Sequence, residues 1–291
     1  MLPLESVPNF SEGRDETTIA AIGAALTSAG ARLLDVHADA DHNRSVFTLV
    51  GSEAELADGL VAGVRCARDR IDLRRHEGAH PRIGAADVVP LVPIRPEDLE
   101  RAQAAARDVA AGVGELGIPV FLYGGPERGP AFFRRDGPDG LQARIDAGEL
   151  VPDFGPSRLD PAAGAALVGA RRPLIAFNVN LRTDDVQVAR AIAAVVRERG
   201  GGFPGVRALG LDLPRAGLVQ VSMNVEDWEA VALHEIVARI VEEAASRGVE
   251  AAGSELVGLM PAGAAAAAAG SALRIDGFDA SRVLELRLLD D

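Results

Sequence analysis

The feature of this sequence that most limits its fold is a succession of strand-like and helix-like segments that occurs twice. Each half contains a strand pattern, a helix pattern, two strand patterns, a second helix pattern and a further strand pattern, which is a βαββαβ order. In the first half, the strand patterns cover residues 4–9, 32–37, 45–51 and 87–94, and the helices follow Asp15 and Ser52. In the second half, the strand patterns cover residues 174–181, 206–213, 218–225 and 249–259, and the helices start at Asp184 and Trp228. This order is typical of the split βαβ plan, so we predict an α+β fold of two ferredoxin-like subdomains with a ligand cleft or channel between them.

A long segment between the two repeats does not follow the pattern. A helix at 96–116 and a strand at 120–123 extend the first half, and residues 124–172 are rich in Gly, Pro and Arg. We predict a long connection there, because such a stretch in a compact protein is usually either disordered or functional. The predicted subdomains are residues 1–172, which include this connection, and residues 173–291.

The charged residues and the single cysteine exclude several classes of function. All thirty basic residues are arginine, so no lysine can form a Schiff base, hold pyridoxal phosphate or serve in a phosphate-binding loop. The net charge of −13 opposes binding to nucleic acid or to an anionic membrane. Cys66 is the single cysteine and cannot form an intrachain disulfide, which indicates a reducing compartment, the cytoplasm. We expect Cys66 to be a small core residue. Residues 1–15 lack the pattern of a signal peptide, and the uncharged stretch 256–273 predicts a strand, a turn and a helix of small residues rather than a membrane span.

The densest group of polar residues lies between a predicted helix and a predicted strand. It contains His76, Glu77 and His80 in the H-E-x-x-H spacing of zinc hydrolases. That spacing holds a metal only on a helix, where residues four apart face the same way. Pro81 and Gly78 oppose a helix at this point, and three neighbouring arginines would repel a dication. We therefore expect no metal, and a zinc hydrolase using His76, Glu77 and His80 stays the alternative function.

A loop at this position can also supply an imidazole that titrates near neutral pH among fixed positive charges. Such a group suits proton transfer on an anionic substrate. The plain structural alternative is a solvated loop whose histidines bond to neighbouring backbone groups. The spacing by itself favours the solvated loop.

Six segments spread along the chain carry a specific resemblance. They are residues 7–14 (VPNFSEGR), 43–51 (NRSVFTLVG), 75–90, 151–157 (VPDFGPS), 175–180 (IAFNVN) and 255–259 (ELVGL). Together they resemble the formiminotransferase domain of glutamate formimidoyltransferases, and the likeness covers nearly the whole chain in one order. It implies two α/β subdomains around a folate-binding channel, which agrees with the repeated βαββαβ order.

The resemblance implies a reaction and a site. The reaction is transfer of a formimino group from N-formimino-L-glutamate to N5 of tetrahydrofolate with release of L-glutamate, in histidine degradation. The catalytic histidine of the family lies in a His-Pro-Arg motif, which corresponds to His80. The family's folate-lining segment follows Asp-Phe-Gly and corresponds to Gly155, Pro156, Ser157, Arg158, Leu159, Asp160, Pro161, Ala162, Ala163 and Gly164. Further candidates for binding the folate and the substrate carboxylates are Asn9, Arg44, Arg75 and Arg82.

The partners implied by the resemblance are small molecules. Tetrahydrofolate is expected as a co-substrate, with formiminoglutamate as the donor and no metal. Neither nucleic acid nor a membrane is expected as a partner, and a homodimer is compatible with the sequence.

Two positions differ from the pattern of the animal enzymes, which has acidic residues where this chain has Ala79 and His37. The donor therefore stays open, with formyl transfer between 5-formyltetrahydrofolate and glutamate as a close alternative. A folate-binding protein without turnover is a further alternative. The cyclodeaminase domain of the bifunctional animal enzyme has no counterpart here, so we expect a separate protein to remove ammonia from the product.

Other polar residues have plain structural interpretations. We expect Asp41 and Asn43 to cap the turn around His42, because Asp and Asn side chains bond to turn backbone. Asn178 and Asn180 end an apolar strand, where an amide could bond a pteridine edge or an unpaired backbone group.

Overall fold

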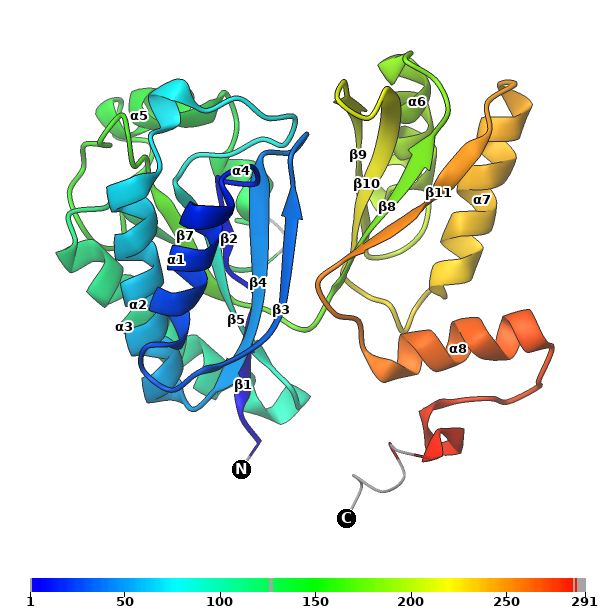
Figure 1. The fold of residues 1–291 in the computed structure, drawn as a ribbon, viewed down its shortest axis with the longest axis horizontal. Coiled ribbons are helices and arrows are strands. Elements are labelled where there is room, and N and C mark those ends of the chain that lie inside the picture. Colours follow the sequence, from blue (N-terminus) through cyan, green and yellow to red (C-terminus); the bar gives the residue numbers. More distant parts are fainter. Residues whose placement is uncertain (1, 126–127, 285, 287–291) are drawn as a thin grey trace. The chain divides into compact units, whose positions relative to one another are not determined.

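The computed structural model of this chain describes residues 2–125, 128–284 and 286 (Figure 1). The chain divides between Arg172 and Pro173 into two units, and each has its own sheet and its own apolar core. Because both units combine helices with a sheet, the predicted α+β class is confirmed.

The first unit is built on a seven-stranded sheet. Its strands are β1 (Leu4–Ser6), β2 (Asn9–Phe10), β3 (Arg32–Asp39), β4 (Arg44–Gly51), β5 (Ala86–Pro93), β6 (Val120–Tyr123) and β7 (Ala166–Ala170). The strand order is β1-β4-β2-β5-β7-β6, and β3 pairs with the outer side of β4. The sheet is mixed, because β7 runs parallel to both β5 and β6 while the strands from β1 to β5 pair antiparallel.

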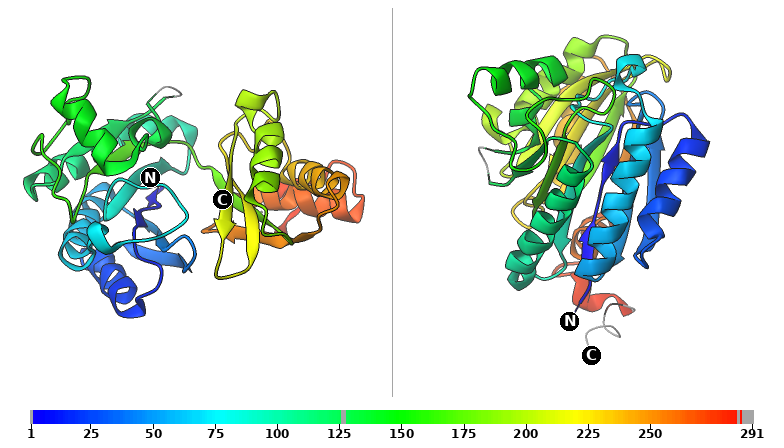
Figure 2. Two further views of the ribbon diagram at one scale, coloured as in Figure 1. Left: turned by 90° about the horizontal axis from the view of Figure 1, so that it is seen from above. Right: turned by 90° about the vertical axis from the view of Figure 1, so that its left-hand side faces the viewer.

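Helices cover both faces of this sheet. They are α1 (Glu16–Thr27), α2 (Glu53–Arg70), α3 (Leu99–Glu115), α4 (Pro130–Phe133) and α5 (Gly137–Asp146), with 3-10 turns at Leu73–Arg75 and Pro96–Asp98. The helices α1, α2 and α3 lie side by side (Figures 1 and 2) and share a core with Val168 of β7. Leu167 of the same strand packs instead with Phe133 and Leu141 of α4 and α5. Since neighbouring strand residues face opposite sides, α4 and α5 cover the face across from α3.

Local sequence explains where the long helix α2 begins. Ser52 Oγ accepts the Glu55 N–H, and the Glu55 carboxylate accepts the Ser52 N–H at 2.8 Å, so the two residues form a capping box, and the helix predicted to follow Ser52 is confirmed. The apolar stripe of Leu56, Leu60 and Val64 is buried, as its helical spacing predicts.

Two expectations for the first unit were wrong. The strand predicted at 4–9 is interrupted after Ser6, where Pro8 has no N–H to continue the ladder. The connection predicted at 124–172 contains α4, α5 and the strand β7. A strand buried between two parallel neighbours lacks the alternating pattern by which strands are predicted, and β7 is such a strand.

The second unit is a four-stranded antiparallel sheet covered by helices. Its strands are β8 (Ile175–Leu181), β9 (Val206–Leu213), β10 (Leu218–Val225) and β11 (Ala251–Val257), in the order β11-β8-β10-β9. Its helices are α6 (Val186–Val196), α7 (Leu233–Ser246) and α8 (Ala262–Leu273), with 3-10 turns at Glu198–Gly200 and Ala280–Arg282. The strand, turn and small-residue helix predicted for 256–273 are confirmed by β11 and α8. Within the part of the chain that the structure describes, no helix is long and apolar enough to cross a membrane.

Both predicted helix starts in the second unit were too early. The helix α6 is capped by Asp185, whose carboxylate accepts the Gln187 N–H at 2.9 Å. Before α7, Asp227 forms a turn in which its carbonyl accepts the Ala230 N–H at 3.2 Å, so Trp228 lies outside the helix. Polar side chains that bond to the backbone compete with helix at such positions.

We expect Gly164→Ala to destabilise the first unit. Gly164 has a φ of +69°, and a Cβ there would lie 2.0 Å from the Ile83 carbonyl oxygen. Strain of this kind costs roughly 1–3 kcal/mol, measurable as a loss in the free energy of unfolding in urea. The matched control is Gly148→Ala, where φ is +74° but nothing lies within 4 Å of the added atom. Equal losses in the two variants would show that the contact with Ile83 has no role.

Candidate active site

The dense group of polar residues that contains His76 and His80 lies on a loop between α2 and β5, here called the histidine loop (residues 76–85). The loop is not helical, since the 3-10 turn before it ends at Arg75 and His76 is already extended. The expectation drawn from Gly78 and Pro81 is therefore confirmed.

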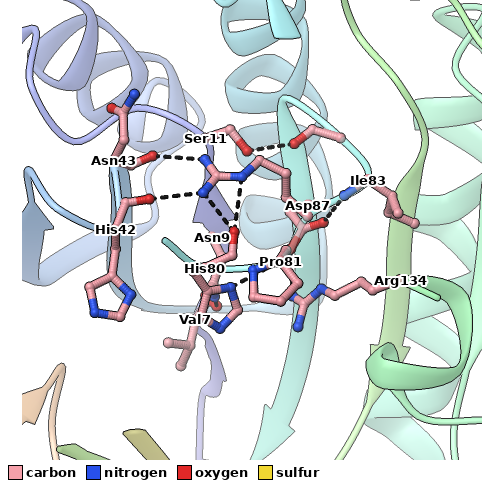
Figure 3. A network of polar contacts seen from close by, with 12 residues as sticks. Val7, Asn9, Ser11, His42, Asn43, His80, Pro81, Ile83, Asp87 and Arg134 are labelled. Carbon is pink, nitrogen blue, oxygen red and sulfur yellow. Dashed lines mark hydrogen bonds and ion pairs between the residues drawn. The ribbon is translucent and has the colours of Figure 1, made fainter. Parts of the chain in front are cut away.

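Arg82 holds the histidine loop against the turn between β3 and β4 (Figure 3). Its Nη2 donates to the carbonyls of His42 and His80 at 2.9 and 2.6 Å, and its Nη1 donates to the Asn43 carbonyl at 3.1 Å. Its Nε donates to the His80 carbonyl at 3.1 Å. One guanidinium thus joins two segments that are about forty residues apart in the chain, which its planar fork of donors allows.

Backbone and amide contacts add to this attachment. The Ala79 N–H donates to the Asp41 carbonyl at 3.0 Å, and Asn43 Nδ2 donates to the Glu77 carbonyl at 3.0 Å. Gly78 is required by this approach, because a Cβ there would lie 2.3 Å from the His42 carbonyl oxygen.

His80 presents one ring nitrogen as an acceptor. The ring is partly buried, and its Nδ1 lies 2.8 Å from the Pro81 carbonyl oxygen. Because a carbonyl only accepts, Nδ1 carries the proton when the imidazole is neutral, and Nε2 then holds a lone pair. The His42 ring lies beside it (Figure 3), with ring centroids 5.9 Å apart.

The charges around His80 favour its neutral form. Burial, followed by the positive charges of Arg44 and Arg134 and by His42, holds the pKa of His80 well below its ordinary value. The sequence analysis expected fixed positive charges around this loop. The structure adds Arg134, which the sequence analysis did not select.

Asp87 lies at the centre of these arginines. Its side chain is 5% exposed, and it forms an ion pair with Nη2 of Arg134, at the end of α4. Its other oxygen accepts the Ile83 N–H at 2.8 Å, so it also fixes the end of the histidine loop. Burial and the charge of Arg134 lower the pKa of Arg44 to about 9, which Asp87 offsets in part.

His76 occupies a different place in the loop. Its Nε2 lies 2.9 Å from the Asn43 carbonyl oxygen, and its Nδ1 lies 2.8 Å from Nη1 of Arg82. Both ring nitrogens are thus used within the protein. Among the residues that the structure describes, no group of three or more His, Cys, Asp or Glu side chains is placed to hold a metal ion.

The predicted folate segment packs against the histidine loop through its second half. The Leu73 and Ala85 N–H groups donate to the carbonyls of Ala162 and Ala163, each at 2.9 Å, and Leu159 is buried in the core. The first half is exposed, and this part comprises Gly155, Pro156, Ser157 and Arg158. The structure therefore brings residues 159–164 and the loop of His80 together.

The other predicted binding residues are divided between interior and surface. Asn9 is 7% exposed and its Nδ2 donates to the Val7 carbonyl at 2.7 Å. Arg44 points into the group around Asp87, as its charge interactions indicate. Arg75 is exposed at the end of its 3-10 turn, where its backbone N–H donates to the Asp72 carbonyl at 3.1 Å.

The hydrogen bonds around the turn at His42 differ from those expected from the sequence. In the turn at His42, the Asp39 carboxylate accepts the His42 N–H at 2.6 Å, a contact that the sequence analysis did not select. Asn43 instead bonds to the distant backbone of Gly13 and Glu77. These contacts join residues far apart in the sequence, which turn composition cannot indicate.

Arg134 and Asp87 were missed for different reasons. Arg134 lies in the segment expected to be a connection, so its burial was not anticipated. Asp87 begins a strand whose other residues are apolar, and a carboxylate in that position requires a partner. The carboxylate therefore signalled a buried polar contact, although the sequence did not show which residue is its partner.

The second unit carries polar side chains on one face of its sheet. Asn178 Nδ2 donates to Glu255 at 3.0 Å, and Gln220 Nε2 donates to the Asn180 side-chain oxygen at 2.9 Å. The two asparagines therefore bond to side chains of neighbouring strands, not to unpaired backbone groups.

The fold and the site define a class of protein: a two-unit α+β protein with an acceptor histidine among buried guanidinium groups. The chain matches the formiminotransferase domain, N-terminal subdomain, over residues 3–171, and the formiminotransferase domain over residues 176–276. The chain belongs to the formiminotransferase domain family.

Relatives from bacteria, archaea and animals are similar to most of the chain. Glutamate formimidoyltransferase of Streptococcus pyogenes is 40% identical, with 98% of each chain covered. The protein of that name from Thermoplasma acidophilum is 39% identical over 98% of this chain and 97% of its own. Formimidoyltransferase-cyclodeaminase of Rattus norvegicus is 39% identical over 89% of this chain and 50% of its own length.

We expect His80 to titrate below the ordinary histidine pKa of about 6.5, because burial and the two arginine charges disfavour its protonated form. The measurement is an NMR titration of the histidine ring signals, assigned with His80→Ala. In Arg134→Gln, one positive charge is lost and the midpoint should move upward. An unchanged midpoint in this variant would contradict the role of Arg134 in the electrostatics of the site.

Proposed function

We propose that this protein transfers a formimino group from N-formimino-L-glutamate to N5 of tetrahydrofolate and releases L-glutamate. The observation that carries the proposal is His80, whose Nε2 is an acceptor in a neutral ring surrounded by positive charge. The full-length similarity to glutamate formimidoyltransferases supports the same reaction.

The chemistry requires one group that accepts a proton and then returns it. The N5 lone pair attacks the amidine carbon, and the electrons of the C=N double bond move to the imino nitrogen. N5 becomes cationic and gives its proton to Nε2 of His80. The imidazolium then protonates the nitrogen of the glutamate moiety, the C–N bond breaks with its electrons on that nitrogen, and the imino nitrogen re-forms the double bond. A side chain in this role typically contributes about 10²- to 10⁴-fold to the rate.

The low pKa of His80 suits the first of these transfers. A neutral imidazole at physiological pH is ready to accept the proton, whereas a protonated one would have to lose it first. Once protonated, an imidazolium close to Arg44 and Arg134 donates readily, since those charges disfavour its cationic form.

The remaining candidates are assigned by their contacts. Arg82 uses its donors on carbonyl groups of the protein, so we assign it to positioning His80. Tetrahydrofolate is proposed to bind along residues 155–164 and near Asn9, next to the histidine loop. Arg75, being exposed, is proposed to contact only the outer part of the folate.

The proposal also includes a ferredoxin-like strand order in each unit and the bounds of the two functional subdomains. The strand order β11-β8-β10-β9 in the second unit supports a ferredoxin-like plan, and the order of β3, β4, β2 and β5 supports it in the first. We propose that the functional subdomains are residues 1–172 and 173–291. The cleft between them, the cytoplasmic location and the homodimer stay predictions.

The test is incubation with tetrahydrofolate and N-formimino-L-glutamate, scored by release of glutamate. We expect release that a chelator leaves intact, since both ring nitrogens of His76 are already bonded within the protein. A parallel reaction of 5-formyltetrahydrofolate with glutamate tests the formyl alternative. Loss of activity with chelator and recovery with zinc would support a zinc hydrolase, and folate binding without glutamate release would support a binding protein.

We expect His80→Ala to lower turnover by about 10²- to 10⁴-fold at saturating folate, because it removes the group that moves the proton. Folate affinity should stay within a few-fold of wild type. His76→Ala is the matched control, since it removes an imidazole from the same loop and should have a much smaller effect. Comparable turnover in His80→Ala and wild type would exclude His80 from the mechanism.

A further inference from the structure

The arginines around Asp87 carry more positive charge than the buried carboxylate can neutralise. Arg44, Arg82 and Arg134 all interact with one another, and burial and charge lower the pKa of Arg82 to about 10. Asp39 is the further anion that acts on Arg44. Three cations thus gather around one buried carboxylate and one carboxylate at the edge of the group.

Two of these guanidinium groups have unused donors inside the protein. In the described part of the chain, the Nε atoms of Arg44 and Arg134 are both buried and have no hydrogen-bond partner. Arg82, in contrast, bonds to three carbonyls. A buried donor without a partner is costly, and a buried cation without one is more costly still, so such a group indicates a place for an anion.

Asp87 orients one of these arginines. It pairs with Nη2 of Arg134, whose side chain is 15% exposed, and leaves the rest of the guanidinium available. A planar guanidinium fixed from one side can bind a carboxylate with its remaining donors. Figure 3 shows Arg134 reaching this position from the side opposite His42, with His80 and Pro81 between them.

We propose that Arg134, oriented by Asp87, forms with Arg44 the subsite for the α-carboxylate of the glutamyl substrate. This assignment rests on the proposed function, because it takes N-formimino-L-glutamate as the donor. Arg134 and Arg44 then select a donor whose reacting nitrogen carries a neighbouring carboxylate.

The position of His80 decides which carboxylate is bound. His80 acts at the nitrogen of the glutamate moiety, and the α-carboxyl carbon is two bonds from that nitrogen. The γ-carboxyl carbon is four bonds away, and the carboxylates of the folate lie beyond its aminobenzoyl group. Arg134 lies next to His80 and Pro81 (Figure 3) and is therefore placed for the α-carboxylate.

The experiment measures binding by calorimetry in the absence of folate. The ligands are N-formimino-L-glutamate, its α-carboxamide and its γ-carboxamide. We expect the α-carboxamide to bind wild type about 10- to 100-fold more weakly than the parent compound, as loss of a charge-assisted contact implies, and the γ-carboxamide to lose less. The opposite ranking would overturn the assignment.

Variants test whether Arg134 makes the contact. Arg134→Gln should weaken binding of the parent compound by about 10- to 100-fold and leave binding of the α-carboxamide unchanged. Arg135→Gln is the matched control. Arg135 is an exposed neighbour of Arg134, so this variant should bind all three ligands as wild type does. Equal weakening of all three ligands in Arg134→Gln would indicate structural damage and would contradict the subsite.

Failure of this inference and failure of the proposed function give different results. If the carboxamide ranking holds but no glutamate is released with tetrahydrofolate, the subsite stands and the proposed reaction is wrong. If glutamate is released and Arg134→Gln has an unchanged KM for the donor, the reaction stands and the subsite is wrong. The ranking of ligands on wild type needs no variant, so it remains decisive even if Arg134→Gln does not fold.

Discussion

The guanidinium of Arg82 joins the histidine loop to the turn between β3 and β4, and the geometry of the site depends on this contact. Its nitrogens donate to the carbonyls of His42, Asn43 and His80. Asn43 and Asp87 add separate bonds to Glu77 and Ile83 of the same loop, but Arg82 bonds to the carbonyl of His80 and to the turn at once. An arginine is suited to the task because one rigid group satisfies several carbonyls at once, which a lysine could not do in the same geometry.

The site also concentrates positive charge inside an acidic protein. The chain has a net charge of −13, yet Arg44, Arg82 and Arg134 gather around the buried Asp87. Surface charges are screened over about 8 Å at physiological ionic strength, whereas buried charges are screened much less. The local group therefore determines the electrostatic environment of His80, and the overall charge determines the field at the surface.

Burying several like charges opposes stable folding, and here the cost is concentrated next to the reacting group. Burial lowers the pKa of Arg44 and His80 alike, although the consequences differ. For His80, it yields the neutral ring that a proton acceptor requires. For Arg44, it accompanies a buried Nε that has no hydrogen-bond partner among the described residues. Strain and unpaired charge that serve no packing purpose are typical of functional sites.

The sequence by itself determined the features that depend on neighbouring residues. The repeated order of strands and helices, the capping box at Ser52 and the non-helical loop around Gly78 and Pro81 all follow from local periodicity and backbone preference. Six motifs, each contiguous in the chain, likewise indicated the family.

Only the tertiary structure decided how distant residues combine. The strand β7 carries no alternating pattern, since it is buried between parallel neighbours, and its place in the sheet arises from pairing with β5 and β6. Arg134 reaches Asp87 across 47 positions of sequence, and Arg82 reaches His42 across 40. A buried charge must find a partner, but one sequence does not state which residue supplies it, because that choice depends on how the sheet and its helices pack.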